Sequence, residues 1–338
     1  MKAMVLRASG DLVLDNVEQP KPSPNQVLVR VTHSGICGTD LKIYNGGIPV
    51  RHPLIMGHEM AGEVVECGGE QLRPGDRVVV DPIQYCGACF YCRAGLTNLC
   101  PSGGLIGRDV DGGFAEYVIA PRSHVFKLPD TIDNRKAPLL QVVTTCLHAQ
   151  RLAGIFPGQS VVVMGLGVTG QVHVQLAKTR GAHPVVGVSR SAWKRSLAES
   201  FGADITVASG PECALMVSEA TEGRGADVVI ESTGVVASIA EAISIARPGG
   251  TLLLFGTTAA TQGALPFYQL YFKELKIVNA RAAKSEDYPA TIDLAARGAL
   301  NLDPLVTHML PLSELGSAMH MLESDADRRM KIILENNV

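Results

Sequence analysis

A glycine-rich turn between an apolar strand and a helix constrains the fold more than any other stretch. Residues 161–164 are apolar and run into Gly165-Leu166-Gly167-Val168-Thr169-Gly170, after which residues 171–178 follow a helical pattern. The glycines allow a tight turn, close approach of a pyrophosphate and packing of helix on strand, while the helix N-terminus favours negative charge. Between a strand and a helix, this pattern predicts a dinucleotide site.

Strands and helical segments alternate after residue 152, which predicts βαβ units and a parallel sheet. The strands are expected at residues 160–164, 184–189, 204–207, 226–231, 250–255 and 275–279. Six such strands are what a doubly wound dinucleotide fold needs. Thr233 and Phe255 lie at the carboxyl ends of two of them, where ligands of open α/β sheets collect. We assign both to the cofactor site, with ordinary strand-to-helix turns as the alternative.

The end of the second of these strands bears on which dinucleotide binds. An NAD site places Asp or Glu there, whereas this chain has Ser189 and Arg190, with Lys194 and Arg195 on the next turn. A carboxylate would repel a 2′-phosphate, and a small hydroxyl beside a guanidinium would receive it. The sequence therefore favours NADP. If Arg190 is only a surface cation, NAD is used as well.

The first 140 residues read as a mostly β domain. Short β-branched runs at residues 26–31, 61–65, 77–80 and 116–119 are separated by Gly, Pro, Asn and Asp. Such runs predict strands joined by turns. From about residue 281 the pattern becomes mixed again.

Four cysteines stand close together with two, two and seven residues between them: Cys86, Cys89, Cys92 and Cys100. Four thiolates on one small lobe predict a closed tetrahedral zinc site with no position for substrate, and therefore a structural role. An iron–sulfur cluster is the competing interpretation, because Cys-x2-Cys-x2-Cys also occurs in ferredoxins. The fourth cysteine at seven residues favours zinc.

A second set of metal-binding side chains comes from two short segments. Cys37 offers a thiolate, and His58 and Glu59 offer an imidazole and a carboxylate. Zinc binds all three groups. A catalytic zinc keeps a position for water or substrate, and three protein ligands would leave one.

Cys37-Gly38-Thr39-Asp40, Gly57-His58-Glu59 and the cysteine lobe, together with the glycine fingerprint, resemble the zinc-dependent medium-chain dehydrogenase/reductase superfamily, which includes zinc alcohol, polyol and threonine dehydrogenases. The resemblance covers the whole chain. It implies a discontinuous GroES-like, mostly β catalytic domain at residues 1–140 and 282–338, with a structural-zinc lobe at residues 84–101. It also implies a Rossmann domain with a parallel sheet at residues 141–281, and thus an α/β protein that binds two zinc ions per chain.

The resemblance also implies the ligands of the catalytic zinc. Cys37 and His58 match the thiolate and the imidazole, and the third position falls at Gln141, where relatives carry Cys, Glu or Asp. Because glutamine is a neutral donor, we expect Glu59 to be a direct ligand and Gln141 to bind either directly or through a water. Asp40 is expected to hold the far nitrogen of His58.

Proton transfer is assigned by position in the same way. Thr39 is expected to take the proton of the alcohol, and Lys42 stands where relatives often have a relay histidine. A lysine titrates near 10, so Lys42 is a poor relay at neutral pH unless its pKa is depressed. It could instead hold a phosphate or ribose of the cofactor, or be solvated.

The resemblance implies a reversible oxidation of an alcohol, of the secondary or polyol class, with hydride transfer to a nicotinamide cofactor, for which Ser189 and Arg190 favour NADP. An NADPH-dependent carbonyl or double-bond reductase on the same fold is the alternative, followed by a non-catalytic zinc and nucleotide binder. The last strand, residues 276–280, is an edge strand in such folds, so a homodimer or homotetramer is expected.

The composition excludes some partners. With 46% hydrophobic residues, a net charge of −3 and no run of like charge, the chain offers no basic surface for nucleic acid or an anionic membrane. No stretch approaches about 18 apolar residues and no leader pattern is seen at the N-terminus. We therefore expect a cytoplasmic enzyme with a small-molecule substrate.

Overall fold

The computed structural model describes residues 1–338 except residues 70, 259, 325–327 and 337–338. Contacts divide the chain into two units. The first unit contains Met1–Thr144, Ala283–Gly298 and Leu302–Val338, and the second contains Thr145–Ala282 and Ala299–Asn301. The first unit is therefore discontinuous in sequence, and the division falls inside the helix α3 (Leu139–Ala153).

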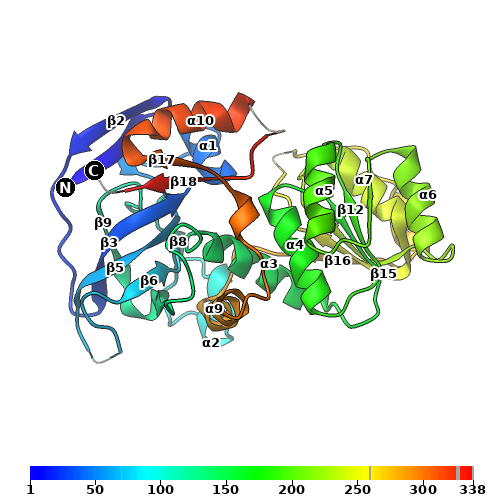
Figure 1. The fold of residues 1–338 in the computed structure, drawn as a ribbon, viewed down its shortest axis with the longest axis horizontal. Coiled ribbons are helices and arrows are strands. Elements are labelled where there is room, and N and C mark those ends of the chain that lie inside the picture. Colours follow the sequence, from blue (N-terminus) through cyan, green and yellow to red (C-terminus); the bar gives the residue numbers. More distant parts are fainter. Residues whose placement is uncertain (70, 259, 325–327, 337–338) are drawn as a thin grey trace. The chain divides into compact units, whose positions relative to one another are not determined.

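The first unit is built on a seven-stranded sheet (Figure 1). Its order is β10 (Val125–Lys127), β6 (Arg77–Val80), β5 (Glu59–Cys67), β3 (Gln26–Gly35), β18 (Lys331–Glu335) and β17 (Val306–Pro311), and β9 (Tyr117–Pro121) also pairs with β3. Because β18 runs antiparallel to β3, the end of the chain becomes part of the N-terminal unit.

Smaller elements complete this unit. One sheet has the order β2 (Asp11–Asn16), β1 (Lys2–Ala8) and β4 (Leu54–Ile55), and another pairs β7 (Ile83–Gln84) with β8 (Gly104–Leu105). The helices are α1 (Gly38–Tyr44), α2 (Phe90–Arg93), α9 (Tyr288–Ala296) and α10 (Leu315–Ser324), with the first part of α3.

The core of the first unit follows from residue alternation along its strands. Val27, Val29 and Val31 of β3 point to one face and pack with Val78 and Val80 of β6. Side chains two apart on a strand share a face, so β-branched residues at this spacing bury one side of the sheet. A second cluster joins β1, β4 and the buried face of α10.

The second unit is a doubly wound α/β fold. Its parallel sheet has the order β13 (Ile205–Val207), β12 (Val185–Val188), β11 (Val161–Met164), β14 (Ala226–Glu231), β15 (Ala246–Leu254) and β16 (Lys276–Asn279). The helices between the strands are α4 (Val168–Thr179), α5 (Ala192–Ser200), α6 (Pro211–Ala220), α7 (Val236–Ile245) and α8 (Phe267–Phe272). This order is that of a dinucleotide-binding Rossmann sheet. Successive strands are added on one side of β11 up to β13, and from β14 onward they are added on its other side.

The predicted fold class is confirmed, and all six strands expected after residue 152 occur. One strand is longer than expected: β15 begins at Ala246 instead of residue 250. The reason is an additional pair between Ala226 and Ala246, after which the register shifts before Val228 pairs with Thr251. A Pro-Gly-Gly sequence lies in this irregular part, which is why the pattern of residues reads as a turn.

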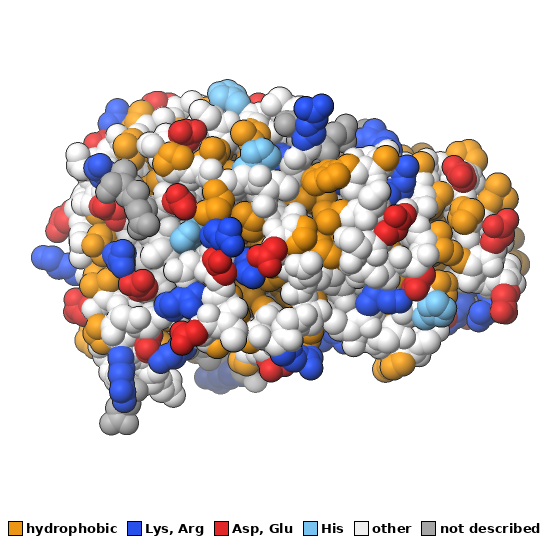
Figure 2. Space-filling view, viewed as in Figure 1, with side chains coloured by type: hydrophobic (Ala, Val, Ile, Leu, Met, Phe, Trp, Pro, Cys, Tyr) orange, Lys and Arg blue, Asp and Glu red, His pale blue; other side chains and the backbone are white. Residues whose placement is uncertain are grey.

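The surface mixes both signs of charge, as the face in Figure 2 shows. Within the described part of the chain, no helix combines the length and the apolar character needed to cross a membrane.

Candidate active site and metal centres

The four clustered cysteines bring their sulfur atoms together. The Sγ–Sγ distances are 4.0 Å for Cys86 and Cys92, 3.5 Å for Cys89 and Cys92, and 3.9 Å for Cys89 and Cys100. Four thiolates around one zinc ion, with Zn–S bonds of about 2.3 Å, stand about 3.8 Å apart at the corners of a tetrahedron. All four are free cysteines. Their spacing fits a closed, four-thiolate zinc site.

Backbone N–H groups point at these sulfurs. Cys86 N–H donates to Cys100 Sγ at 3.4 Å, and Cys92 N–H donates to Cys89 Sγ at 3.5 Å. Hydrogen bonds from the backbone of Ala88 and Cys89 lower the pKa of the Cys86 thiol to about 6. At Cys86 these donors favour the thiolate, which is the form that binds metal, whereas desolvation and the side chain of Cys89 raise the pKa of Cys92 to about 12.

Cys37, His58 and Glu59 form the second centre, with one ligand atom from each lying within 4.8 Å of the others. Cys37 follows β3 and is the N-cap of α1, and Glu59 begins β5. The antiparallel register of β3 and β5 sets Gly35 opposite Glu59, which brings the two segments together. His58 is 4% and Glu59 is 1% exposed. This constellation, predicted from two separate motifs, can hold a zinc ion.

Asp40 links the first segment to the imidazole. Its Oδ2 accepts a hydrogen bond from Cys37 N–H at 2.8 Å, which closes the first turn of α1. Its Oδ1 lies 3.2 Å from His58 Nδ1, within ion-pair distance, although the orientation of the two groups is not that of a hydrogen bond. Burial tends to lower the pKa of His58, but the charges of Asp40 and Cys37 outweigh it and raise that pKa well above its usual value. A carboxylate beside Nδ1 leaves Nε2 for a metal.

Lys331 is a buried residue of this site that the sequence analysis did not predict. Its Nζ donates to both carboxylate oxygens of Glu59 at 2.7 Å and to the carbonyl of Ile36 at 3.0 Å. Burial alone would lower the pKa of Lys331, but the charge of Glu59 outweighs it and raises that pKa. A lone lysine at the start of the apolar strand β18 is the signal, because a fully buried lysine requires an acidic partner.

Gly35 makes room for this pair. A Cβ at Gly35 would stand 2.1 Å from Glu59 Oε2, so any larger residue would displace the carboxylate. The side chain of Glu59, and not the backbone conformation at Gly35, is therefore what requires glycine at this position.

The other predicted residues of this site lie at different depths. Thr39 is half-buried in the first turn of α1, and Lys42 is exposed in its last turn. Gln141 is 8% exposed and lies in the first turn of α3, within the first unit. Their roles stay predictions.

The glycine fingerprint has the geometry of a phosphate-binding turn. Gly165 has φ +91°, and a Cβ at Gly170 would stand 1.9 Å from the carbonyl oxygen of Gly165. A Cβ at Gly167 would meet nothing within 4 Å, so the turn is open on that side. Gly167 is the N-cap of α4 and makes no side-chain cap. The first N–H groups of this helix are thus available to an anion, which fits the pyrophosphate of a dinucleotide.

The turn after β12 carries the residues expected to contact the 2′ position of the cofactor's adenosine ribose. Ser189 is half-buried and Arg190 is exposed. Arg195 Nη1 donates to the carbonyl oxygen of Ser189 at 2.7 Å and to that of Arg190 at 3.1 Å. The carbonyl of Lys194 accepts from Gln171 Nε2 at 2.8 Å.

Glu231, which was not predicted, shapes the next strand end. It is fully buried, and its carboxylate accepts from Thr233 N–H at 2.8 Å, from the Thr233 hydroxyl, and from Gly234 N–H at 3.0 Å. The carbonyl oxygen of Glu231 accepts from Phe255 N–H at 2.8 Å. The two strand ends named as cofactor-binding are thus held by one residue. An acidic residue ending an apolar strand, followed by Ser-Thr-Gly, is the signal for it.

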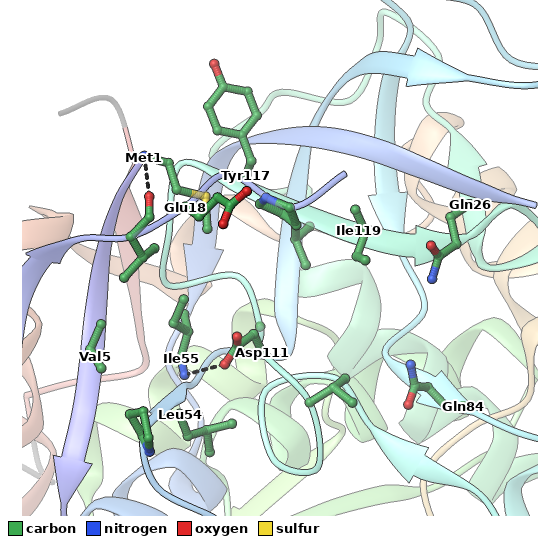
Figure 3. Close-up of a pocket in the computed structure, with 16 residues that line it drawn as sticks. Met1, Val5, Glu18, Gln26, Leu54, Ile55, Gln84, Asp111, Tyr117 and Ile119 are labelled. Carbon is green, nitrogen blue, oxygen red and sulfur yellow. Dashed lines mark hydrogen bonds between the residues drawn. The ribbon is translucent and has the colours of Figure 1, made fainter. Parts of the chain in front are cut away.

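A pocket of about 380 Å³ lies elsewhere on the first unit (Figure 3). Its lining includes Val5, Leu54, Ile55, Tyr117 and Ile119, and Asp111 accepts from Ile55 N–H at 2.9 Å beside it. None of the predicted metal ligands or cofactor residues lines this pocket. It is therefore separate from both metal centres.

Together, a β unit with two clusters of potential zinc ligands and a Rossmann unit with an open glycine turn define a class of protein: the zinc-dependent nicotinamide dehydrogenases. Two family models match this chain. Residues 23–130 match the alcohol dehydrogenase GroES-like domain, and residues 168–297 match the zinc-binding dehydrogenase domain.

Whole-chain relatives agree. The chain is 33% identical to a sorbitol dehydrogenase of Halalkalibacterium halodurans over 331 residues, covering 96% of each chain. A crystal structure of a zinc-binding dehydrogenase from Sinorhizobium meliloti bound to NADP has 34% identity and a TM-score of 0.92, covering 99% of this chain and 98% of that one. An NAD-dependent alcohol dehydrogenase has 29% identity and a TM-score of 0.92, covering 99% of each chain.

The chain belongs to the zinc-dependent medium-chain dehydrogenase/reductase superfamily, and it is a zinc-type alcohol dehydrogenase that uses a nicotinamide cofactor. The predicted family and enzyme class are confirmed, and the non-catalytic alternative is set aside.

Proposed function

We propose that this enzyme reversibly oxidises a secondary alcohol or polyol and transfers the hydride to NADP. The convergence of Cys37, His58 and Glu59 within 4.8 Å carries the proposal. These residues would hold the catalytic zinc, with Gln141 as a direct ligand or one that binds through a water. Cys86, Cys89, Cys92 and Cys100 would hold a second, structural zinc.

When bound, zinc supplies a Lewis acid that stabilises negative charge on the alcohol oxygen. The chain's own residues do the rest. Asp40 lies beside Nδ1 of His58, which would leave Nε2 for the metal, and Lys331 holds the carboxylate of Glu59 through two hydrogen bonds. The hydroxyl of Thr39 takes the proton of the alcohol and releases its own proton to water. Lys42, exposed on the same helix, is either the next proton carrier or a contact to the cofactor.

The polyol class is supported by the ligand set and by a relative. Replacing the family's usual charged third ligand with neutral Gln141 gives Glu59 a larger share in metal binding. The similar sorbitol dehydrogenase acts on a polyol. A substrate with vicinal hydroxyls would offer two oxygens to such a site.

NADP preference rests on the turn after β12. The absence of an acidic residue among Ser189, Arg190 and Ser191 removes the partner that ribose hydroxyls need, and the exposed guanidinium of Arg190 suits a phosphate. The similar structure from Sinorhizobium meliloti holds NADP.

A homodimer formed through the second unit accounts for its exposed apolar surface. β16 ends its sheet, and the adjacent helix α8 exposes Phe267, Tyr268, Tyr271 and Phe272 to between 66% and 82%. An unpaired edge strand and a contiguous aromatic surface are both expected at a symmetric interface. Tyr271→Asp should therefore shift the mass measured by light scattering toward the monomer. Leu215→Asp, at a 66% exposed position on α6, is the matched control.

A cytoplasmic location is proposed because all eight cysteines are free.

The first experiment measures NADP and, separately, NAD reduction by the zinc-loaded enzyme with primary alcohols, secondary alcohols, polyols and 3-hydroxy amino acids. Turnover of polyols or secondary alcohols with NADP supports the proposal, and a strong preference for NAD contradicts its cofactor part. Carbonyl or double-bond reduction that survives in Cys37→Ser would indicate the reductase alternative.

A further inference from the structure

The side chain of Arg195 holds the turn between β12 and α5 through hydrogen bonds to its backbone. Arg195 Nη1 bridges two successive carbonyl oxygens, those of Ser189 at 2.7 Å and Arg190 at 3.1 Å. The backbone N–H of Arg195 donates to the carbonyl of Ser191 at 3.2 Å, so this arginine stands in the first turn of α5 and reaches back over the turn. Its guanidinium thus contacts the backbone of the residues expected to bind phosphate.

The contact has an electrostatic consequence. Two carbonyl oxygens at this turn present partial negative charge where a 2′-phosphate, itself an anion, is expected to bind. A guanidinium bonded to both oxygens offsets that charge and holds the turn in one conformation. In contrast to Arg195, the side chain of Arg190 is exposed and makes no hydrogen bond to any other residue that the structure describes.

Other contacts fix the same turn on both sides. Ser191 N–H donates to the Ser189 hydroxyl at 3.3 Å, and Ser189 N–H donates to the carbonyl of Val207 in β13 at 3.1 Å. Gln171, in the helix that follows the glycine turn, donates to the carbonyl of Lys194 at 2.8 Å. Preorganisation of this kind reduces the cost of ordering a site when its ligand binds.

We propose that Arg195 is a positioning residue for the 2′-phosphate of the dinucleotide: it sets the turn from which Arg190 and Ser189 contact the phosphate, and does not bind the phosphate itself. This inference rests on the proposed NADP preference. Arg190 contacts the phosphate, and Arg195 positions the turn that carries Arg190.

The test compares two nucleotides that differ by the phosphate in question. Dissociation constants for adenosine 2′,5′-bisphosphate and 5′-AMP are measured by calorimetry on the zinc-loaded wild type, Arg190→Gln, Arg195→Gln and the double variant. Quenching of Trp193, the chain's single tryptophan, gives a second readout, since it is 41% exposed and stands two residues before Arg195.

Wild type should bind the bisphosphate more tightly than 5′-AMP. Arg195→Gln should weaken bisphosphate binding about tenfold, the effect of losing one charge-assisted contact, and leave 5′-AMP binding nearly unchanged. Because Arg195 acts mainly by positioning Arg190, the loss of bisphosphate binding in the double variant should be clearly smaller than the sum of the two single losses.

Two results would overturn the inference: an unchanged ratio of the two constants in Arg195→Gln, or losses that add in the double variant, which would make Arg195 an independent phosphate ligand. If Arg195→Gln also loses 5′-AMP binding, Arg195→Lys replaces it in the same cycle. A wild type that does not distinguish the two nucleotides contradicts the NADP preference instead.

Discussion

Lys331 and Glu59 form a buried ion pair in which one ammonium group donates to both carboxylate oxygens at 2.7 Å. The two residues are 272 positions apart in sequence, and they meet because β18 joins the sheet next to β3. The carboxylate oxygens of Glu59 therefore have two partners: Lys331, which donates hydrogen bonds to them, and the metal that Glu59 is expected to bind.

Removing one partner of this pair should destabilise the first unit strongly. Lys331→Met leaves a buried carboxylate without its countercharge, a change that costs about 3–5 kcal/mol. The double variant Glu59→Gln with Lys331→Met should regain part of the loss. Urea unfolding of the zinc-loaded proteins measures both. The control is Lys127→Met, which breaks the exposed pair with Asp76 and should change little. A stable Lys331→Met would mean that the bound metal or water, rather than Lys331, compensates the charge of Glu59.

The third ligand of the catalytic zinc can be assigned by metal affinity. If Glu59 binds zinc, Glu59→Gln should lower the affinity of one of the two zinc ions by at least about tenfold, the effect of losing a charged contact, while Gln141→Ala should have a smaller effect. Competition with a chromogenic chelator measures the affinities. A larger loss in Gln141→Ala would make Gln141 the direct ligand.

Loss of the structural site should affect stability more than chemistry. Cys100→Ser removes one corner of the four-thiolate cluster, so the protein should hold one zinc ion fewer and unfold at a lower temperature, because structural zinc contributes to folding free energy. Elemental analysis and calorimetric scanning measure the two effects. Cys67→Ser, outside both metal centres, should keep the zinc content of the wild type.

Two glycines of the fingerprint should respond differently to the same substitution. In Gly170→Ala the new methyl group meets the carbonyl oxygen of Gly165 at 1.9 Å, so the turn must move and the melting temperature should fall. In Gly167→Ala nothing lies within 4 Å, so the protein should fold normally. The methyl group should nevertheless block close approach of the pyrophosphate. NADPH binding by Gly167→Ala that equals the wild type would contradict this placement of the cofactor.

Asp81 should make stability depend on pH. Burial raises its pKa to about 6, against the hydrogen bonds that it accepts from the Ser285 hydroxyl at 2.6 Å and from Ile83 N–H. An unfolded aspartate titrates near 3.9. Between about pH 4 and pH 6 the folded state holds a proton that the unfolded state has lost, so the free energy of unfolding falls as pH rises through this range.

Asp81→Asn removes that proton equilibrium and keeps a side chain of the same shape. Its stability relative to wild type should therefore improve as pH rises from about 4 to about 6. Melting temperatures at matched pH values measure the difference. A difference that does not change with pH would show that Asp81 is ionised throughout. Asp109→Asn, at an exposed carboxylate, is the comparison.

Much of this protein could be predicted from local patterns. The six strands of the second unit were predictable because buried parallel strands are short apolar runs ended by glycine, and the turn at Gly165 because only glycine suits its φ of +91°. The cysteine cluster was predictable because its ligands are close in sequence, so their spacing almost fixes the geometry. Cys37 and His58 were found through motifs that each carry recognisable neighbours.

Tertiary structure decided what depends on distant segments or on side-chain direction. Lys331 becomes the partner of Glu59 only when the last strand pairs with β3, and no local pattern encodes that pairing. In the sequence, Arg190 and Arg195 are both arginines close to the end of the same strand, and nothing distinguishes their roles. In the structure, Arg195 donates to two backbone carbonyl oxygens, whereas the side chain of Arg190 faces solvent. Residue type determines which chemistry is available, but the partner a charged group finds depends on the three-dimensional path of the chain.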